Sequence, residues 1–570
     1  MHQPEAQPRA SLYFDYRVHP AWLPSAHEVE EEVQVAIVGG GPIGLALALD
    51  LARHGVRCVL LEAERQVSEG SRAIVFTRRS MEILHQLGVA GRVAAKGLPW
   101  RYGNSYYRGR RVFRMAAPHD ADQRFLPMTN LQQPYLERYL AEALGQSPHA
   151  ELRWGNRVSA IAQDEDGVRL TVETPAGDYA LRAQWVVAAD GARSTLRQLL
   201  GLKMEGTAYE GRFVIADIRA ELDLPTERLA FFDPPWNPGN TVLMHREPDG
   251  IWRVDYQLPP GETAEEALAP AALRSRIDAA LALVGAAGQQ WELDWCSVYS
   301  ARAMTLPDYL HGRVAFVGDA AHLLPIFGVR GANTGFQDAH DLAWKLALEL
   351  RGCAGPGLLP SYSQERVAAA REIIDEAGKS TRFMTPPSPG YRLLRDAVLS
   401  LALSEEFVRP LLHWRTSRAH DYAASALNCV GDDDALFEAG PGHGAPCTDL
   451  RLGGDAFLLD HLGPAFQLLY FGAGPTPEVL ACMASFRQRG VPLRLLLVER
   501  SGVNGAVEAD QILPDSEGRL RQHFGVTVDG AAYLLRPDQH VCARWLTLSA
   551  DRLEAALNAA LGHSNRSFTS

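Results

Sequence analysis

The sequence predicts an α/β protein with three parts: a parallel sheet, an antiparallel sheet interleaved with it, and a small α/β domain near the C-terminal end. Three observations support this fold class. A buried strand, a glycine-rich turn and a helix follow one another from residue 33. Residues 207–300 alternate between apolar and polar side chains, as antiparallel strands do. Strand-like segments recur beyond residue 440 and predict the last domain.

Composition and charge exclude several classes of partner. The 56 basic and 68 acidic residues give a net charge of -12, which disfavours nucleic acid and anionic membrane surfaces. No apolar run approaches the roughly 20 residues that span a bilayer, and the first ten residues lack the apolar core of a secretory signal. Seven cysteines without a CxxC pair predict free thiols in a reducing compartment. We expect a cytoplasmic protein without a metal site.

The first motif lies in a βαβ unit over residues 33–62. A strand at 33–38 leads into a turn that contains Gly39, Gly41, Pro42, Ile43 and Gly44. A helix at 45–54 and a second strand at 56–61 follow, and that strand ends at Glu62 and Ala63. Such glycines let the backbone approach a pyrophosphate, and the acid accepts ribose hydroxyls. The alternative is a glycine turn without a ligand. We predict a Rossmann-like dinucleotide-binding domain, with FAD or NAD favoured because Glu62 would repel a 2′-phosphate.

A second motif follows another apolar strand at 185–189. Asp190-Gly191 comes directly after it, and Arg193 precedes Ser194 at the start of a short helix. Asp-Gly is also a common turn, and Ser194 could simply cap the helix. Beside the other two motifs, we expect this segment to belong to the nucleotide site.

The third motif is the most informative part of the chain. An apolar strand at 313–317 brings Gly318-Asp319 to its C-terminal end. The following loop passes through Pro325 and opens a helix at Gly331-Ala332-Asn333. A carboxylate, bare backbone and a helix N-terminus suit a ribityl chain and a ring that gains negative charge. This pattern favours a flavin over a nicotinamide as the resident cofactor.

Together, the order and spacing of the three motifs resemble the class A flavoprotein monooxygenases, the family of para-hydroxybenzoate and phenol hydroxylases, over about residues 33–380. The resemblance implies that the glycine turn and Glu62 hold the ADP part of FAD. It also implies that Asp319 binds the ribityl chain and that the backbone of 331–333 faces the flavin N1 and C2 carbonyl. Asp190 and Arg193 match positions that contact FAD and NAD(P)H. Arg72 and Gln133 match residues near FAD, although a surface arginine and a helix cap are the alternatives.

The function implied by this resemblance is hydroxylation of an aromatic, phenolic substrate with NADPH or NADH and O₂, through a flavin C4a-hydroperoxide. Two alternatives stay open at this point. One is a Baeyer–Villiger or epoxidising monooxygenase that acts on a polyketide-like substrate. The other is a non-catalytic FAD-binding interaction protein.

The loop after Asp319 departs from the usual family pattern where the family binds its substrate. Ile326 stands in place of a second proline, and Val329-Arg330 replaces a Gly-Gln type pair. The expected substrate residues are Ile326, Phe327, Gly328 and Arg330. Arg330 either attracts an anionic group of the substrate or is a solvated loop residue.

Three residues of the predicted antiparallel sheet are candidates for acid–base chemistry. They are His245, Arg253 and Tyr256. Removing a proton from a phenol makes the ring more nucleophilic, so a positioned base would promote the reaction. A structural role is the alternative for each of the three.

The predicted domain boundaries follow the shifts in pattern. We expect an N-terminal extension at 1–32, FAD-binding segments at 33–100, 131–206 and 301–380, substrate-domain segments at 101–130 and 207–300, a helical linker at 381–440, and a last domain at 441–570. The last segment resembles the thioredoxin-like domain of phenol hydroxylase-type members through Gly444-Ala445-Pro446-x-x-Asp449 and Tyr533-Leu534-Leu535-Arg536-Pro537-Asp538. Because it has no CxxC, we expect it to support the structure or a homodimer rather than exchange disulfides.

Overall fold

A parallel sheet forms the centre of the first domain in the computed structural model, which describes residues 2–24, 31–259, 261–325, 327–412, 418–499 and 508–563. Its strands run in the order β17 (Leu310–His311), β18 (Val314–Phe316), β11 (Gly177–Ala188), β1 (Glu31–Val38), β2 (Cys58–Glu62) and β8 (Ala150–Trp154). β9 (Arg157–Gln163) and β10 (Val168–Thr174) extend it as antiparallel strands. The inner half of β1 is buried on both faces, which explains its nearly continuous apolar sequence.

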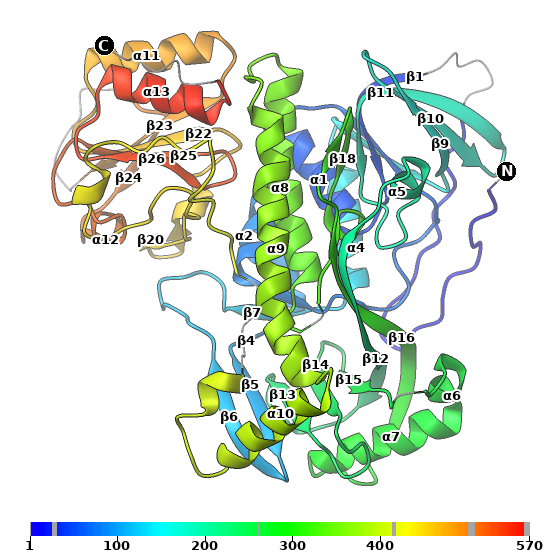
Figure 1. Cartoon of the computed structure of the whole chain (residues 1–570). Helices are drawn as coiled ribbons and strands as arrows, with labels where there is room; N and C mark the ends of the chain where they lie inside the picture. Colours follow the sequence, from blue (N-terminus) through cyan, green and yellow to red (C-terminus); the bar gives the residue numbers. More distant parts are fainter. Residues whose placement is uncertain are drawn as a thin grey trace.

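Helices cover the apolar faces of this sheet. They are α1 (Pro42–Arg53), α2 (Arg78–Gln86), α3 (Ala90–Lys96), α4 (Gln133–Leu144), α5 (Thr195–Leu199), α8 (Gly331–Leu350) and α9 (Leu358–Met384). α1 packs against both α4 and α8, so it is buried from Gly44 to Ala52. α8 and α9 run side by side along the middle of the molecule, between the sheet and the C-terminal domain (Figure 1).

An antiparallel sheet forms the second layer, below the parallel sheet in Figure 1. Its order is β19 (His322–Leu323), β16 (Trp291–Thr305), β12 (Glu205–Ala220), β15 (Ile251–Gln257), β14 (Thr241–Arg246), β13 (Arg228–Phe232), β5 (Tyr102–Tyr107) and β6 (Arg110–Ala116). Only the β13–β5 pair is parallel among these described strands. Because β5, β6 and β19 come from segments that flank the parallel sheet in sequence, the two sheets are interleaved. This arrangement confirms the predicted fold class.

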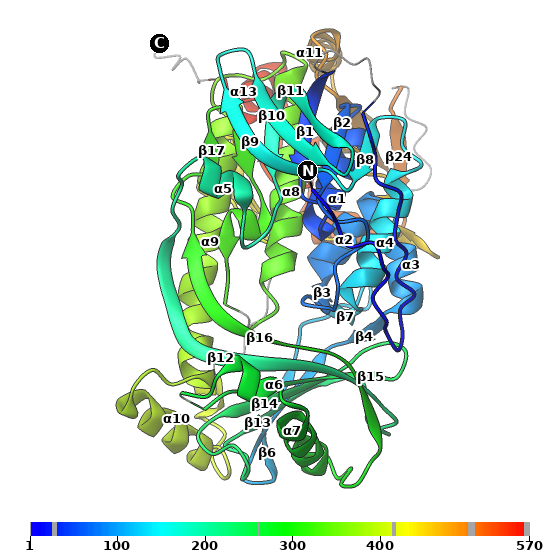
Figure 2. The same cartoon turned by 90° about the vertical axis from the view of Figure 1, so that its right-hand side faces the viewer.

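The antiparallel sheet has two different faces. α6 (Ala264–Leu268) and α7 (Pro270–Leu283) cover its outer face, as Figure 2 shows. The inner face looks toward the parallel-sheet domain. A small sheet of β3 (Val75–Thr77), β7 (Met128–Asn130) and β4 (Leu98–Trp100) lies between the two layers.

The C-terminal domain is a separate mixed sheet. Its order is β24 (Gln511–Pro514), β23 (Leu493–Glu499), β22 (Phe466–Phe471), β25 (Ala531–Leu535) and β26 (Val541–Trp545), with α11 (Pro477–Gln488), α12 (Arg519–His523) and α13 (Ala550–Ala560). β22 and β23 are parallel and joined by α11, whereas β25 and β26 are antiparallel. The resemblance leads us to expect this topology, and the thioredoxin-like assignment itself stays a prediction.

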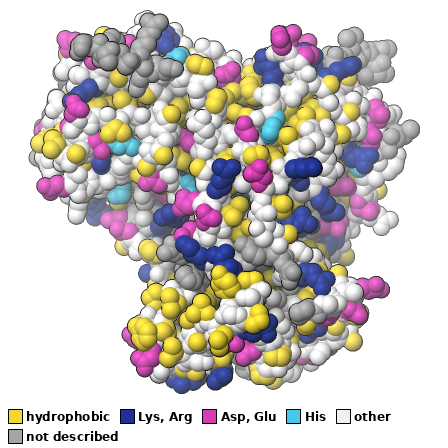
Figure 3. Space-filling model, in the orientation of Figure 1, with side chains coloured by type: hydrophobic (Ala, Val, Ile, Leu, Met, Phe, Trp, Pro, Cys, Tyr) yellow, Lys and Arg dark blue, Asp and Glu magenta, His cyan; other side chains and the backbone are white. Residues whose placement is uncertain are grey.

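One more helix, two short strands and four 3-10 turns complete the described chain. They are α10 (Pro389–Leu401), β20 (Arg451–Gly453), β21 (Ala456–Phe457) and the 3-10 turns η1 (Gly318–Ala320), η2 (Arg409–Leu412), η3 (Asp434–Leu436) and η4 (Leu458–Asp460). Apolar side chains gather on the surface over α10 in Figure 3, among them the exposed Leu393 and Leu394. The seven cysteines are unpaired. No helix within the described residues combines the length and apolarity needed to cross a bilayer.

The described part of the N-terminal extension follows the surface of the first domain through specific contacts. Trp22 N donates a hydrogen bond of 2.9 Å to Trp154 O at the end of β8. Ser11 Oγ donates to Asp294 Oδ1 on β16 over 2.7 Å. The segment therefore connects the edges of both sheets, although its loose, polar sequence gave no sign of these contacts.

A buried network of charges joins the C-terminal domain to α8 and α9. Arg536 pairs with Asp341 at 2.7 Å and with Glu365 at 2.8 Å, and it also binds Asp538 in its own domain. Lys345 pairs with the same Asp341 and Glu365 at 2.9 and 2.7 Å. All five side chains are at most 4% exposed. Because the two cations serve three carboxylates, removal of either cation would leave buried charge unpaired.

Arg536→Ala should destabilise the protein by about 3–5 kcal/mol, because it leaves buried carboxylates without their partner. The midpoint of urea unfolding, followed by circular dichroism, measures this loss. Arg92→Ala is the matched control, since the Arg92–Glu142 pair is about half exposed and should contribute no more than about 1 kcal/mol. Equal midpoints for the two variants would contradict a structural role of the network.

Candidate active site

The turn after β1 is folded so tightly that only glycine fits at two of its positions. Gly39 has a φ of +110°, and a side chain there would collide with the carbonyl of Ala189. A side chain on Gly44 would collide with the carbonyl of Gly39. Gly41 is different, because among the described residues no atom beyond its chain neighbours and local helix backbone lies within 4 Å of where its Cβ would be. The backbone at Gly41 therefore faces open space at the uncapped N-terminus of α1, where a phosphate binds well.

Glu62 is held beside this turn at the end of β2. Its Oε2 accepts a hydrogen bond of 2.6 Å from Gly40 N, and its Oε1 accepts one of 2.8 Å from Glu64 N. Burial raises the pKa of the Glu62 carboxyl, and these backbone N–H groups oppose that shift. Each oxygen keeps a further lone pair, so Glu62 can still accept ribose hydroxyls. The neighbouring Ala63 O lies 2.7 Å from His2 Nε2 of the N-terminal extension.

The Asp-Gly motif has a capping function and also an unused oxygen. Ser194 Oγ accepts a hydrogen bond from Arg197 N at 3.0 Å, so Ser194 is indeed a helix cap. Asp190 Oδ2 accepts one from Leu196 N at 3.0 Å in the same helix. Asp190 Oδ1 is buried without a partner among the described residues. Native structures rarely leave such an atom unpaired, so it fits a ligand or water contact.

The rest of the Asp-Gly motif is more open. Gly191 adopts a φ of +74°, which turns the chain at the end of β11. Arg193 is exposed. Its predicted contact with FAD or NAD(P)H stays a prediction.

Ile43 of the first motif connects the first and third motifs. A Cβ on Gly318 would lie 3.2 Å from Ile43 Cγ1, and one on Gly335 of α8 would lie 2.8 Å from Ile43 Cδ1. Since Gly39 also meets Ala189 before the Asp-Gly motif, all three motifs converge at one place. This convergence is the spatial arrangement that a single elongated cofactor requires.

Asp319 and the start of α8 face each other at this place. A Cβ on Gly331 would lie 3.8 Å from Asp319 Oδ1. Asp319 is exposed to solvent, yet the surrounding atoms raise the pKa of its carboxyl, and the positive charge of Arg72 and other cations opposes this shift. The Asp319 carboxylate is therefore accessible from solvent beside the start of α8.

Within the described residues, the N-terminus of α8 has no side-chain cap, so its first N–H groups can act as hydrogen-bond donors. The N-cap residue Arg330 supplies no side-chain acceptor, so the first N–H groups of the helix, from Gly331, Ala332 and Asn333, are left to bind a ligand. They combine with the positive end of the helix dipole. The donor set thus fits a flavin ring that gains negative charge.

Asn333 contributes more than its backbone. Its Oδ1 accepts hydrogen bonds from Thr77 N at 2.8 Å and Ser80 Oγ at 2.6 Å, and its Nδ2 donates to Val75 O and Val329 O at 2.8 and 2.7 Å. The side chain is therefore fully used in fixing the start of α8. The sequence did not predict this role, although an asparagine in the first turn of a helix is a signal for it.

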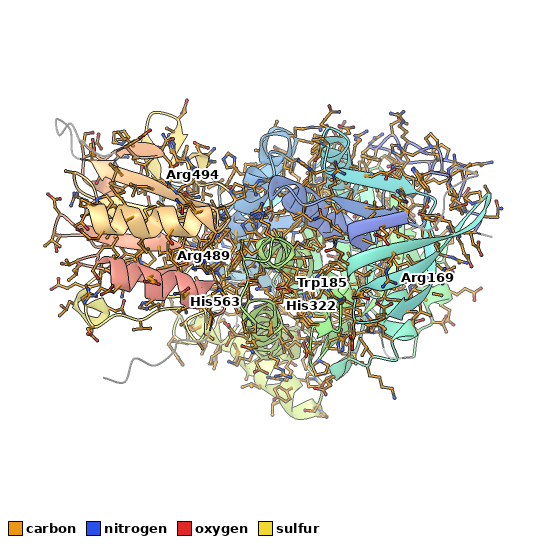
Figure 4. The ribbon with its side chains drawn as sticks, turned by 90° about the horizontal axis from the view of Figure 1, so that it is seen from above. Arg169, Trp185, His322, Arg489, Arg494 and His563 are labelled. Carbon is orange, nitrogen blue, oxygen red and sulfur yellow. The ribbon has the colours of Figure 1, made fainter. Side chains whose placement is uncertain are left out.

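Asp338 fixes the Gly318-Asp319 loop from the next turns of α8. Its Oδ2 accepts a hydrogen bond of 3.0 Å from Gly318 N and lies 2.7 Å from His322 Nε2, while Oδ1 accepts one of 2.6 Å from Arg366 Nε. These partners hold the pKa of Asp338 well below its usual range. His322 lies in the interior, near the end-on helices of Figure 4.

Arg197 connects the second and third motifs. Its Nη1 donates to Ala320 O at 3.0 Å and its Nη2 donates to Ala192 O at 2.7 Å. Arg197 follows Ser194 by three residues, and its residue type alone did not indicate that it links two loops.

Gln133 and Arg72 belong to one supported segment. Gln133 Oε1 accepts a hydrogen bond from Ala73 N at 3.0 Å, and Gln133 N donates to Ser71 Oγ at 2.8 Å. Gln133 is the first residue of α4 rather than its cap, which is Gln132. The Arg72 side chain is exposed near Asp319. Direct contact of either residue with the cofactor stays a prediction.

The loop between Asp319 and α8 reaches the inner face of the antiparallel sheet. Phe327 is buried and packs against Phe213 of β12, with the ring centroids 5.4 Å apart. Pro325 is also buried, and Gly328 has a φ of +98°. Arg330 is 5% exposed, so it is not a solvated loop residue. Ile326 lies outside the described residues.

The three predicted acid–base candidates have different environments. Tyr256 pairs with Val242 on the outer face, in the apolar cluster under α7, so it lies on the side of the sheet away from the cofactor loops and the structure does not support its predicted catalytic role. Arg253 lies on the inner face but is fully used: it binds Asp217 at 2.8 and 2.9 Å and donates to Arg72 O at 3.1 Å. It is a positioning residue. His245, opposite Arg253, remains a candidate because its buried Nδ1 has no hydrogen-bond partner among the described residues.

Two hollows lie away from these motifs. One of about 160 Å³ lies between α9 and α10 and one of about 510 Å³ lies beside Asp308 and α9, and neither is lined by a residue of the three motifs. No group of His, Cys, Asp and Glu in the described ranges is placed to hold a metal ion. The site is therefore defined by the convergent loops and not by either of these two hollows.

Known proteins show the same organisation. The model of the family described as "FAD binding domain" matches residues 32–377. A 3-(3-hydroxy-phenyl)propionate/3-hydroxycinnamic acid hydroxylase of Mycolicibacterium smegmatis is 28% identical over 92% of both chains. The structure of the flavin-dependent monooxygenase PieE in complex with FAD and substrate matches with a TM-score of 0.77 and 26% identity, over 93% of this chain and 98% of that one. A p-nitrophenol 4-monooxygenase from Pseudomonas putida matches with a TM-score of 0.59 and 27% identity, over 68% of this chain and its own full length.

Fold and site together define a class A flavoprotein monooxygenase, an aromatic hydroxylase with FAD as cofactor and NAD(P)H and O₂ as co-substrates. The chain belongs to the FAD binding domain family. The alternatives of a Baeyer–Villiger or epoxidising enzyme and of a non-catalytic FAD protein are less well supported.

Asp319→Ala should weaken FAD binding, because it removes the carboxylate opposite the start of α8. The expected result is a purified protein with a flavin-to-protein absorbance ratio well below that of the wild type. Asp223→Ala, an exposed carboxylate in the loop after β12, is the control and should keep its flavin. Full flavin content in Asp319→Ala would show that this carboxylate does not hold the cofactor.

Proposed function

We propose that the enzyme hydroxylates a small phenol that carries a carboxylate side chain. The observation that carries this proposal is the similarity over 92% of both chains to a relative named for two such acids. Arg330, buried at the junction of the cofactor loop and the substrate face, supports it, because a buried guanidinium suits a carboxylate. The apolar inner face of the antiparallel sheet would hold the ring.

The roles of the chain's own residues follow from the geometry. When bound, FAD supplies the redox chemistry and the activation of O₂. The glycine turn and Glu62 would hold its ADP part, and Asp319 and the start of α8 would hold the ribityl chain and ring. The buried rings of Phe213 and Phe327 would keep water from the reacting atoms, which limits unproductive loss of the activated oxygen.

A substrate series tests this function. NADPH oxidation and product formation are measured with 3-(3-hydroxyphenyl)propionate, with its neutral amide and with p-nitrophenol. We expect the acid to accelerate flavin reduction more than the amide does, and Arg330→Met to abolish that preference. Arg111→Met, an exposed arginine on β6, is the control. Equal rates with acid and amide would exclude carboxylate recognition, and NADPH oxidation that yields only H₂O₂ would exclude hydroxylation of these compounds.

We also propose that the protein is a cytoplasmic homodimer whose association the C-terminal domain supports. The family resemblance supports this proposal, as does the acidic composition with free thiols. Light scattering on the purified protein should give twice the chain mass of 62.5 kDa. The mass of a single chain at micromolar concentration would contradict the proposal.

A further inference from the structure

A set of polar side chains lies on the inner face of the antiparallel sheet. In β15, Arg253 pairs with Asp217 of β12 and Asp255 pairs with Ile215. Because residues two apart share a face, Asp255 lies on the same face as Arg253. The Arg253 guanidinium binds the backbone carbonyls of residues 71 and 72 in the cofactor-binding domain. Asp255 therefore looks toward the flavin loops.

His245 and Ser105 belong to the same set. His245 is directly opposite Arg253 on β14, and so it is a diagonal neighbour of Asp255, about 7–8 Å away between Cα atoms. Ser105 of β5 lies in the same cross-strand row as Asp255, through Ala230 and Leu243. His245 and Asp255 come from two consecutive strands, whereas Ser105 comes from a strand that is far from both in sequence.

The three side chains share a property that bears on ligand binding. Asp255 Oδ1, His245 Nδ1 and Ser105 Oγ are all buried, and within the described residues none has a hydrogen-bond partner. An unpaired buried polar atom costs about 1–3 kcal/mol, so three on one face are expected only where something else binds them. His245 is 5% exposed, so its environment is determined by the surrounding protein and not by solvent.

An apolar surface surrounds this polar set. Ala230 and Leu243 separate its members, and Phe213, Phe232 and Phe327 belong to the same apolar cluster. Flat apolar walls with a few convergent polar groups are the usual form of a site for an aromatic ligand. A phenol fits such a surface with its ring on the apolar residues and its oxygen at the polar ones.

Burial and the charges around Asp255 bring the pKa of its carboxyl close to neutral pH. Burial raises its pKa to about 7, Asp217 adds to this shift, and Arg253 and Arg228 oppose it. Glu247 and Tyr299 also face this cluster, and burial raises the pKa of each well above its ordinary value. Burial with Arg228 and Arg253 nearby lowers the pKa of His245, which is therefore a neutral imidazole.

We propose that Asp255 is the general base for the substrate's phenol group and that His245 holds the phenol oxygen through Nδ1. This inference rests on the proposed hydroxylation of a phenol. The phenol O–H bond breaks, its proton bonds to the Asp255 carboxylate, and the electron pair stays on the phenol oxygen. The ring carbons ortho and para to that oxygen become more electron-rich and accept the incoming oxygen. The proton returns to the product oxygen before release.

Asp255→Asn tests the base. In the wild type, hydroxylation in a single turnover should rise with pH through about 7, because the ionised carboxylate is the active form. The variant should lose this transition and hydroxylate an ordinary phenol about 10²-fold more slowly. With fluorinated phenols that are already ionised at neutral pH, the variant should hydroxylate less than tenfold more slowly than the wild type. FAD content and flavin reduction by NADPH, which precede this step, should stay unchanged.

Tyr256→Phe is the matched control, because it removes a hydroxyl from the next residue of the same strand on the opposite face. It should keep the wild-type pH profile. His245→Gln should weaken phenol binding and leave the transition near pH 7 in place. An unchanged profile in Asp255→Asn, or equal slowing with ionised and neutral phenols, would overturn the assignment. If the wild type itself hydroxylates no phenol, the proposed function fails instead, so the two failures are distinguishable.

Discussion

The close approach of three loops at Ile43 is the constraint on which the rest of the structure depends. Ile43 fills the space above Gly318 and Gly335, and Gly39 lies directly against Ala189. Larger residues at these glycines would push the loops apart. The spacing of β1, β11, β18 and α8 is therefore determined by contacts that only a bare backbone permits. A cofactor that touches all three motifs needs this spacing to within a fraction of an ångström.

Buried charged side chains on α8 and α9 hold these loops in place. Asp338 binds Gly318 N, His322 and Arg366, and a further network through Lys345 and Arg536 continues along the same helix into the C-terminal domain. Such groups are costly to bury and gain little net stability over apolar residues. Their geometry is nevertheless specific. We infer that they orient α8, so the positive end of that helix keeps its place beside Asp319.

The sequence predicted the cofactor domain well because each of its signals is local. A glycine turn between a strand and a helix, or an acidic residue at a strand end, can be interpreted from the neighbouring residues in sequence. The contacts of Arg197 and Asn333 were not predictable in this way. Arg197 contacts Ala320 and Asn333 contacts Thr77, so each links segments that lie more than one hundred residues apart in sequence. The residue type alone does not indicate such a contact. The N-terminal extension was unpredictable for the same reason.

The substrate face was the hardest part to predict, and the reason is the pleat of a strand. Asp255 and Tyr256 are neighbours in β15, yet one faces the cofactor loops and the other faces α7. Both faces of this sheet are buried, so alternation of polar and apolar residues does not mark the inner side as it does in a half-exposed sheet. The contacts of Arg253 with the backbone carbonyls of residues 71 and 72 identify the inner face instead. Because the predicted flavin loops belong to the other domain, side chains of this face other than Arg253, which binds the carbonyls of residues 71 and 72, can vary without disturbing those loops. The antiparallel sheet is therefore the part of the fold in which substrate choice can vary.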